Sequence, residues 1–174
     1  MAARLPYLER DQVGAETQAI YDRLQQSRGR VLNIFKLMAH HARSLPAFLD
    51  WYPRLAEGPL DMKLRQLAYV KVSQLNHCWY CTTHNIAVGQ KAGVPTEKFS
   101  ALPDYSKSPL FSPLERLVIR YAEEMTRKVQ VEAGLVAALR EALGPAALTQ
   151  LTLTIAAANF TNRFNEALGT ELER

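Results

Sequence analysis

The stretch LNHCWYCTTHN, residues 75–85, holds both cysteines of the chain and two of its four histidines. Cys78 and Cys81 are three positions apart, so a helix that contained both would place their sulfur atoms on neighbouring turns, close enough to form a disulfide. Such a pair fits three kinds of chemistry: thiol–disulfide exchange, metal binding and a structural disulfide. The surrounding residues distinguish between them.

The start of a helix favours thiol chemistry. Asparagine is a preferred N-cap residue, and Asn76 lies at the break between two helical patterns, so we expect it to cap the second helix. Cys78 and Cys81 would then fall in the first turn, where unpaired backbone N–H groups and the helix dipole stabilise a thiolate. We therefore interpret the pair as a redox-active dithiol rather than as two inert buried cysteines.

Two imidazoles strengthen this interpretation. His77, Cys81 and His84 are spaced i, i+4, i+7, and a helix that included His77 would flank Cys81 with imidazole on two sides. A neighbouring imidazole can accept a thiol proton or stabilise the thiolate. Cys78, Cys81 and Asn85 form a second stripe at i, i+3, i+7.

The other two kinds of chemistry fit less well. A structural zinc site takes four ligands, commonly from two Cys-x-x-Cys hooks, and this chain has one hook. His77 and His84 could complete such a site only with distorted helix geometry, so we predict no metal. A disulfide across so short a loop would also gain little stability from loop closure.

Size and charge limit the classes of function. The chain has 174 residues, of which 48% are hydrophobic, and a formal net charge of +4. These values predict one globular domain. Basic residues are scattered among acids rather than gathered with aromatic residues, so we expect no nucleic-acid partner. No secretory signal is visible and no run has the roughly 18 apolar residues of a spanning helix, so we expect no membrane partner and a cytoplasmic location.

The apolar periodicity predicts an all-α protein. The first predicted helix is 11–27, and two short helices follow around Pro46 within 33–58. A helix capped by Asp61 runs to the cysteine motif. The remaining predicted helices are 81–93, 111–128, 132–144 and 145–169. The signals are strongest at Ser112, Pro113 and Glu115, which form a capping box with proline at the first helical position. Gly93, Gly144 and Gly169 are predicted helix ends.

The segment LDMKLRQLAYVKVSQLNHCWYCTTHNIAVGQKAGV, residues 60–94, resembles the core of the carboxymuconolactone decarboxylase and AhpD-like family. GRVLNIFKLMAHH before it and NFTNRFNEALGTELE after it resemble the peroxidase-related branch of that family. The resemblance covers most of the chain from residue 29. It implies a single AhpD-like helical bundle over 1–174, with an N-terminal helical segment at 1–28 and the family core at 29–174.

The resemblance also implies an activity, the reduction of alkyl hydroperoxides without a cofactor. One of Cys78 and Cys81 would attack the peroxide and the other would resolve the sulfenic acid to a disulfide, which an external dithiol or reductase resets. The family motif carries glutamate where this chain has Gln66 and histidine where it has Asn85. The proton relay would then depend on His84, with His77, Gln66 and Asn85 as candidate supports.

Two alternative functions and one expectation about assembly remain. A non-peroxidatic member of the same fold would use its dithiol as a redox-responsive or binding group, and carboxymuconolactone-type decarboxylation is a third, weaker hypothesis. The family assembles into dimers, trimers or hexamers. The predicted helix 145–169 is apolar on more than one face, so we expect a homo-oligomer with this helix or the cysteine helix near a subunit contact. Asn159, Asn162 and Arg163 interrupt that helix and are expected to need hydrogen-bond partners.

Overall fold

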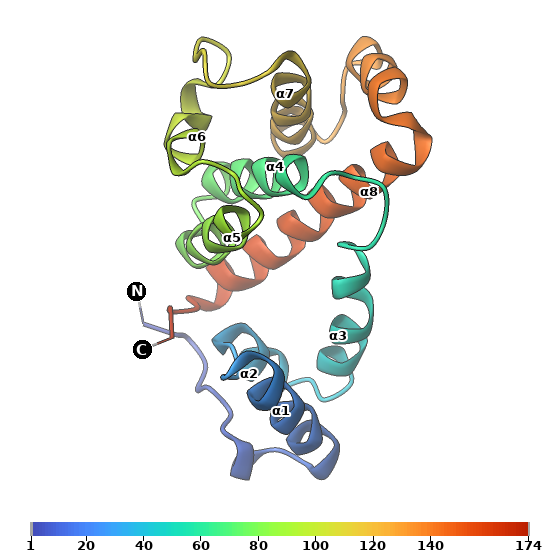
Figure 1. Cartoon of the computed structure of the whole chain (residues 1–174). Coiled ribbons are helices and arrows are strands. Elements are labelled where there is room, and N and C mark those ends of the chain that lie inside the picture. The colour runs from blue at the N-terminus through green and yellow to red at the C-terminus, as the bar shows by residue number, and fades with distance from the viewer. Residues whose placement is uncertain (1, 174) are drawn as a thin grey trace. The chain divides into compact units, whose positions relative to one another are not determined.

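The computed structural model describes residues 2–173, and every regular element in this range is a helix (Figure 1). The predicted all-α class is therefore confirmed. The chain forms two compact units. Unit 1 comprises Met1–Arg54 and Asn165–Arg174, and unit 2 comprises Leu55–Phe164.

Unit 1 contains a short 3-10 helix, η1 (Arg10–Gln12), and three α-helices: α1 (Ala15–Arg28), α2 (Asn33–Met38) and α3 (Ser44–Arg54). The two short helices predicted around Pro46 are present, but they separate at residues 39–43. Pro46 lies in the first turn of α3, where the absence of a backbone N–H is tolerated. Pro53 lies in the last turn of α3, which ends at Arg54.

The C-terminal segment of unit 1 binds the N-terminal segment. The backbone N–H of Arg4 donates to the carbonyl of Leu168 at 2.8 Å, and the N–H of Glu171 donates to the hydroxyl of Tyr7 at 2.9 Å. Asn33 at the start of α2 donates from Nδ2 to the carbonyl of Glu171 at 2.9 Å. These bonds hold residues from the two ends of the chain together in one unit.

Unit 2 is built around α4 (Met62–Leu75), which packs against α5 (Trp79–Lys91) and α7 (Pro113–Lys128) (Figure 1). The short α6 (Thr96–Ala101) and η2 (Leu102–Asp104) connect α5 to α7. Buried side chains from these elements form one hydrophobic cluster, which consists of Leu67, Val70, Val94, Phe99, Leu102, Phe111 and Ile119.

The helix boundaries of unit 2 follow the local signals in the sequence. The carboxylate of Asp61 accepts two backbone N–H groups in the first turn of α4. The hydroxyl of Ser112 accepts the N–H of Glu115, while the Glu115 carboxylate accepts the N–H of Ser112. Gly93, just beyond α5, has a φ of 85°, the left-handed conformation that favours glycine after a helix. All three predicted signals are confirmed.

The last helix, α8 (Ala133–Leu168), is interrupted at Gly144, where φ is 76° and ψ is 164°. It therefore consists of two helical segments that meet at Gly144–Pro145, as predicted. Leu151 and Ile155, which lie four positions apart on one face of this helix, are inaccessible to solvent. Leu153 and Phe160 nevertheless remain 43% and 52% exposed. None of the helices within residues 2–173 is both long enough and apolar enough to cross a membrane.

Gly89 allows α5 to approach its neighbours closely. A Cβ atom at this position would lie 2.4 Å from Cζ of Phe99 and 3.3 Å from Cβ of Gln66. Phe99 belongs to the buried cluster and has almost no solvent exposure. A side chain at Gly89 would therefore have to displace α5 or Phe99.

We predict that Gly89→Ala lowers the free energy of unfolding by about 1–3 kcal/mol, because it overpacks a filled contact. Urea denaturation followed by circular dichroism measures this change. Gly134→Ala is the matched control, because its Cβ would make only an ordinary contact in the first turn of α8. The control should be neutral or stabilising by up to about 1 kcal/mol. Equal stabilities of the two variants would contradict the close packing at Gly89.

Candidate functional site

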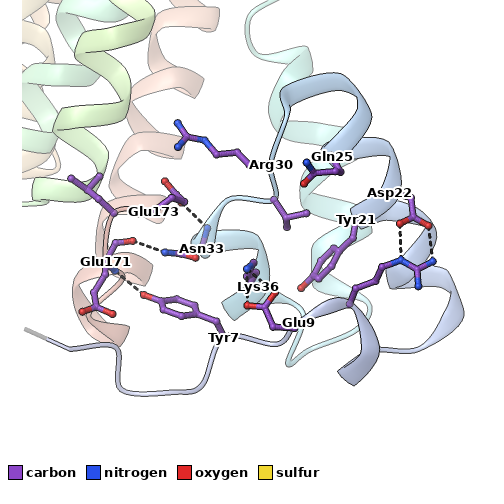
Figure 2. A pocket seen from close by; sticks show the side chains of 13 residues that line it. Tyr7, Glu9, Tyr21, Asp22, Gln25, Arg30, Asn33, Lys36, Glu171 and Glu173 are labelled. Atoms are coloured by element: carbon purple, nitrogen blue, oxygen red, sulfur yellow. Dashed lines mark hydrogen bonds and ion pairs between the residues drawn. The ribbon is translucent and has the colours of Figure 1, made fainter.

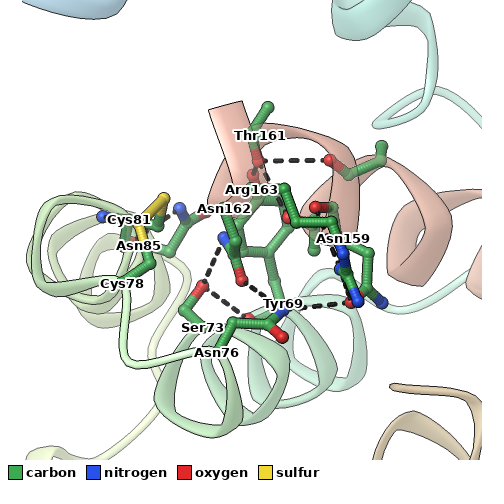
Figure 3. The surroundings of a disulfide bond; sticks show 12 residues. Tyr69, Ser73, Asn76, Cys78, Cys81, Asn85, Asn159, Thr161, Asn162 and Arg163 are labelled. Carbon is green, nitrogen blue, oxygen red and sulfur yellow. Dashed lines mark hydrogen bonds between the residues drawn. A yellow bond between two sulfur atoms is a disulfide. The ribbon is translucent and has the colours of Figure 1, made fainter. Parts of the chain in front are cut away.

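Cys78 and Cys81 form a disulfide at the junction of α4 and α5 (Figure 3). Their Cα atoms are 5.3 Å apart, within the usual range for a disulfide. The exposed fractions of Cys78 and Cys81 are only 0% and 3%. The structure thus contains the intramolecular bond that the spacing predicts, and protein atoms cover it.

The residue that caps the start of α5 is Cys78 and not Asn76. Cys78 is the N-cap residue, and its Sγ accepts the backbone N–H of Cys81 at 3.3 Å. Asn76 is instead the C-cap residue of α4. The backbone N–H of Cys78 donates to the carbonyl of Ser73 at 2.9 Å, which closes the end of α4 as in a Schellman motif. The prediction that Asn76 caps α5 is wrong, because residues 76–78 form the turn that ends α4.

This turn removes His77 from the predicted stripe of imidazoles. His77 has a φ of 55°, lies between the two helices and is exposed. The stripe through His77, Cys81 and His84 requires a helix that includes all three residues, and α5 begins after His77. A residue other than glycine in this left-handed conformation costs roughly 1 kcal/mol.

A buried amide network holds the turn in place (Figure 3). Nδ2 of Asn76 donates to Oδ1 of both Asn159 and Asn162 at 3.0 Å. Nδ2 of Asn162, which is completely buried, donates to Oγ of Ser73 at 3.3 Å. The expectation that Asn159 and Asn162 need hydrogen-bond partners is confirmed. No local sequence pattern indicates that these residues connect to the cysteine turn.

His84 and Asn85 lie on α5 about one turn beyond Cys81. The half-buried His84 ring contacts Tyr80, with ring centroids 4.5 Å apart. Nδ2 of Asn85 donates to the carbonyl of Cys81 at 2.9 Å. Asn85 therefore contributes a hydrogen bond within α5. His84 is the histidine of α5 and follows Cys81 by three positions.

Gln66 lies apart from the cysteines. It is nine residues before the end of α4 at Leu75, roughly 14 Å along the helix axis. Its Cβ lies beside Gly89, which is eight residues, or roughly 12 Å, beyond Cys81 along α5. The side chain is completely buried, and Nε2 contacts Sδ of Met62 at 3.8 Å. Its Oε1 has no hydrogen-bond partner within residues 2–173.

A second polar cluster lies on the face of α4 that packs against α7. Nζ of Lys71 is 3.6 Å from Glu123, donates to the carbonyl of Leu102 at 3.2 Å and lies 4.8 Å from the centroid of the Tyr105 ring. Burial lowers the pKa of Lys71, and burial together with Glu123 raises the pKa of Tyr105 to about 12. The cluster contains none of the predicted site residues and joins α4 to the elements around it.

Unit 1 contains a cavity of about 690 Å³ (Figure 2). Most of its lining is polar, and its lining residues form two ion pairs: Nζ of Lys36 with Glu9, and Nε of Arg10 with Asp22, both at 2.7 Å. None of the predicted site residues lines this cavity. In the part of the chain that the structure describes, no three His, Cys, Asp or Glu side chains are grouped as metal ligands would be.

Comparison with known proteins identifies the family of the chain. Residues 46–124 match the model of the carboxymuconolactone decarboxylase family. The uncharacterised protein YnjA of Escherichia coli K12 is 32% identical over 142 residues, which are 80% of this chain and 73% of YnjA. The chain belongs to the carboxymuconolactone decarboxylase family.

Solved structures show how widely this family fold is shared. An uncharacterised peroxidase-related protein from Ralstonia eutropha JMP134, described as an alkylhydroperoxidase AhpD core, superposes with a TM-score of 0.85 at 22% identity. The match covers 98% of this chain and 92% of that chain. A variant of the debrominase Bmp8, in complex with 2,3,4-tribromopyrrole, superposes with a TM-score of 0.82 at 18% identity, over 99% of this chain and 93% of that chain. At these identities the likeness shows the fold alone.

We predict that Asn162→Ala lowers the free energy of unfolding by about 1–3 kcal/mol, because it removes hydrogen-bond partners from Ser73 and Asn76 in a buried site. Thr149→Ala, at an exposed position of the same helix, is the control and should change the free energy of unfolding by less than about 0.5 kcal/mol. Urea titration of both variants in the disulfide form provides the comparison. A similar small change in both would show that the network does not stabilise the turn.

Proposed function

We propose that this member of the carboxymuconolactone decarboxylase family reduces hydroperoxides with the Cys78–Cys81 dithiol. The observation that carries the proposal is the disulfide at the start of α5, with the Cys81 N–H directed at Sγ of Cys78. A helix N-terminus stabilises a thiolate, which is the nucleophile that peroxide chemistry requires. A pair that bonds within one helical turn can also resolve its own oxidation product.

The proposed cycle has two halves. One thiolate attacks the terminal oxygen of the hydroperoxide, the O–O bond breaks, and a sulfenic acid and an alcohol form. The second thiol attacks the sulfenic sulfur, which gives the Cys78–Cys81 disulfide and water. An external dithiol, free or carried by a reductase, then returns two electrons by thiol–disulfide exchange. The cycle uses no cofactor and fits a reducing, cytoplasmic compartment.

We assign the supporting imidazole to His84. It follows Cys81 by about one turn on α5 and is half-buried, whereas His77 lies in the exposed turn before the helix. Gln66 and Asn85 are amides, which cannot exchange protons as a carboxylate or imidazole would. The relay proposed here therefore consists of His84 and solvent.

The same observations define a second candidate function. Gln66 is buried away from the cysteines and both cysteines are covered, which favours a redox-responsive protein that is oxidised once rather than turned over. A decarboxylase has no use for a cysteine pair in moving a proton to an enol, which makes that activity the weaker alternative. Turnover therefore separates the first two candidates.

We predict that the protein consumes cumene hydroperoxide catalytically when dithiothreitol is present. Cys78→Ser and Cys81→Ser should each abolish turnover, because one sulfur attacks the peroxide and the other forms the disulfide that dithiothreitol reduces. Peroxide loss is measured with a ferrous–xylenol orange assay. His84→Ala should lower the rate by about 100-fold, the usual size of a general-base contribution. His41→Ala, an exposed histidine of unit 1, is the control.

Counting free thiols makes the outcome decisive. A single pulse of peroxide should convert both thiols of the reduced protein to the disulfide. Loss of the thiols without repeated consumption of peroxide would select the redox-responsive function. Two thiols that persist after the pulse would contradict both candidates.

We also propose that the protein forms a homo-oligomer (a dimer, trimer or hexamer) through the exposed face of α8. Leu153, Ala156 and Phe160 lie on this face at i, i+3, i+7 and are all exposed. A self-complementary apolar face favours closed symmetry.

Sedimentation at micromolar concentration should therefore give a mass of two, three or six times the 19.6 kDa of the chain. Phe160→Asp should shift it toward the chain mass, because a carboxylate would be buried in the contact. Val129→Asp is the control, since Val129 is an 84% exposed apolar residue outside α8. A wild-type species at 19.6 kDa would mean that this face carries no self-association.

A further inference from the structure

We infer that the Cys78–Cys81 disulfide opens in one direction: an incoming thiolate bonds to Sγ of Cys81, and Cys78 leaves. The inference rests on the proposed function, since it concerns the reductive half of that cycle. It assigns different tasks to two cysteines that the sequence motif leaves equivalent. Cys81 carries the mixed disulfide with the reductant, and Cys78 is the leaving group.

The first observation is the hydrogen bond to Cys78. Sγ of Cys78 accepts the N–H of Cys81 at the N-cap of α5, where the helix dipole also favours negative charge. When the S–S bond breaks, the sulfur that leaves takes both bonding electrons and becomes a thiolate. A helix N-terminus lowers the pKa of a thiol, and the thiol with the lower pKa leaves faster.

The second observation is that the backbone of Cys78 is fixed before the bond breaks. Its N–H donates to the carbonyl of Ser73 at 2.9 Å, and the Ser73 hydroxyl accepts a bond from the buried Asn162. The sulfur of Cys78 can therefore stay directed at the Cys81 N–H after reduction. Stabilisation of the leaving thiolate then requires no rearrangement of the turn.

The third observation is exposure. Cys78 is completely buried, and what little surface the pair presents belongs to Cys81, at 3%. A reductant thiolate must reach the sulfur it attacks from the side opposite the S–S bond. The complete burial of Cys78 and the stability of its thiolate as a leaving group thus both favour attack at Sγ of Cys81.

The exchange balances with a dithiol as the reductant. Its first thiolate forms a bond to Sγ of Cys81, and the S–S bond breaks with both electrons on Sγ of Cys78. The second thiol of the reductant loses its proton and attacks the reductant's own sulfur in the mixed disulfide, which releases Cys81 as a thiolate. The reductant is oxidised to its disulfide, two electrons reach the protein, and both cysteine thiolates can take protons from solvent.

The test uses the full-length, oxidised wild-type protein. It is exposed to glutathione in the presence of iodoacetamide, so that a thiolate released by the first exchange is alkylated before it can react back. Fragmentation of the peptide that contains both cysteines then locates each adduct by mass spectrometry. We expect glutathione on Cys81 with a carbamidomethyl group on Cys78, in at least tenfold excess over the reverse arrangement. The reverse arrangement, or an even mixture, would overturn the inference.

A second measurement tests the cause. In Cys81→Ser only Cys78 is free, and in Cys78→Ser only Cys81 is free. The pH midpoint of iodoacetamide alkylation should be lower for Cys78 by about one unit or more. Equal midpoints, or a lower one for Cys81, would remove leaving-group stabilisation as the reason for the direction. Neither measurement uses a peroxide, so an absence of peroxidase activity and an error in the direction of opening remain distinguishable.

Discussion

Cys78 satisfies the ends of two helices at once, and the site depends on this double role. Its backbone N–H closes α4 through Ser73, and its sulfur accepts the N–H of Cys81 in the first turn of α5. Helix ends leave backbone groups without intrahelical partners, and a turn of three residues leaves few atoms to satisfy them. The position of the disulfide is therefore fixed by the same bonds that join the helices, so chemistry at Cys78 and the packing of α4 on α5 are linked.

The amide network extends this constraint into the interior of unit 2. Asn162 forms hydrogen bonds with both Asn76 and Ser73, in a region where an unpaired amide would be costly. A residue of α8 thereby holds the end of α4, and the end of α4 holds Cys78. Buried polar groups that are fully paired restrict a structure to one arrangement more sharply than apolar contacts do. The thiol chemistry proposed for this site would thus take place in a turn that includes His77 in the left-handed conformation.

The fold is shared by proteins whose sequences differ widely from this one. The Ralstonia protein shares the fold at 22% identity, so few individual side chains are needed to specify the helices. Gln66 and Asn85 stand where the resemblance implied an acid and an imidazole. Gln66 packs beside Gly89, and Asn85 donates a hydrogen bond to the carbonyl of Cys81. One fold can support several activities, and the function proposed here rests on Cys78, Cys81 and His84.

The sequence alone determined the features whose physical causes are local. The capping box of Ser112 and Glu115, the N-cap at Asp61 and the break at Gly144 each involve neighbouring residues, so the predicted boundaries agree with the structure. The spacing of the cysteines likewise fixed their ability to pair. The tertiary structure decided the identity of the cap at α5. Asparagine suits both ends of a helix, and Asn76 was assigned to α4 by hydrogen bonds to residues more than 80 positions away in α8. The separation of His77 from the stripe of Cys81 and His84 follows from that same turn, because a helical spacing places side chains together only where the helix forms.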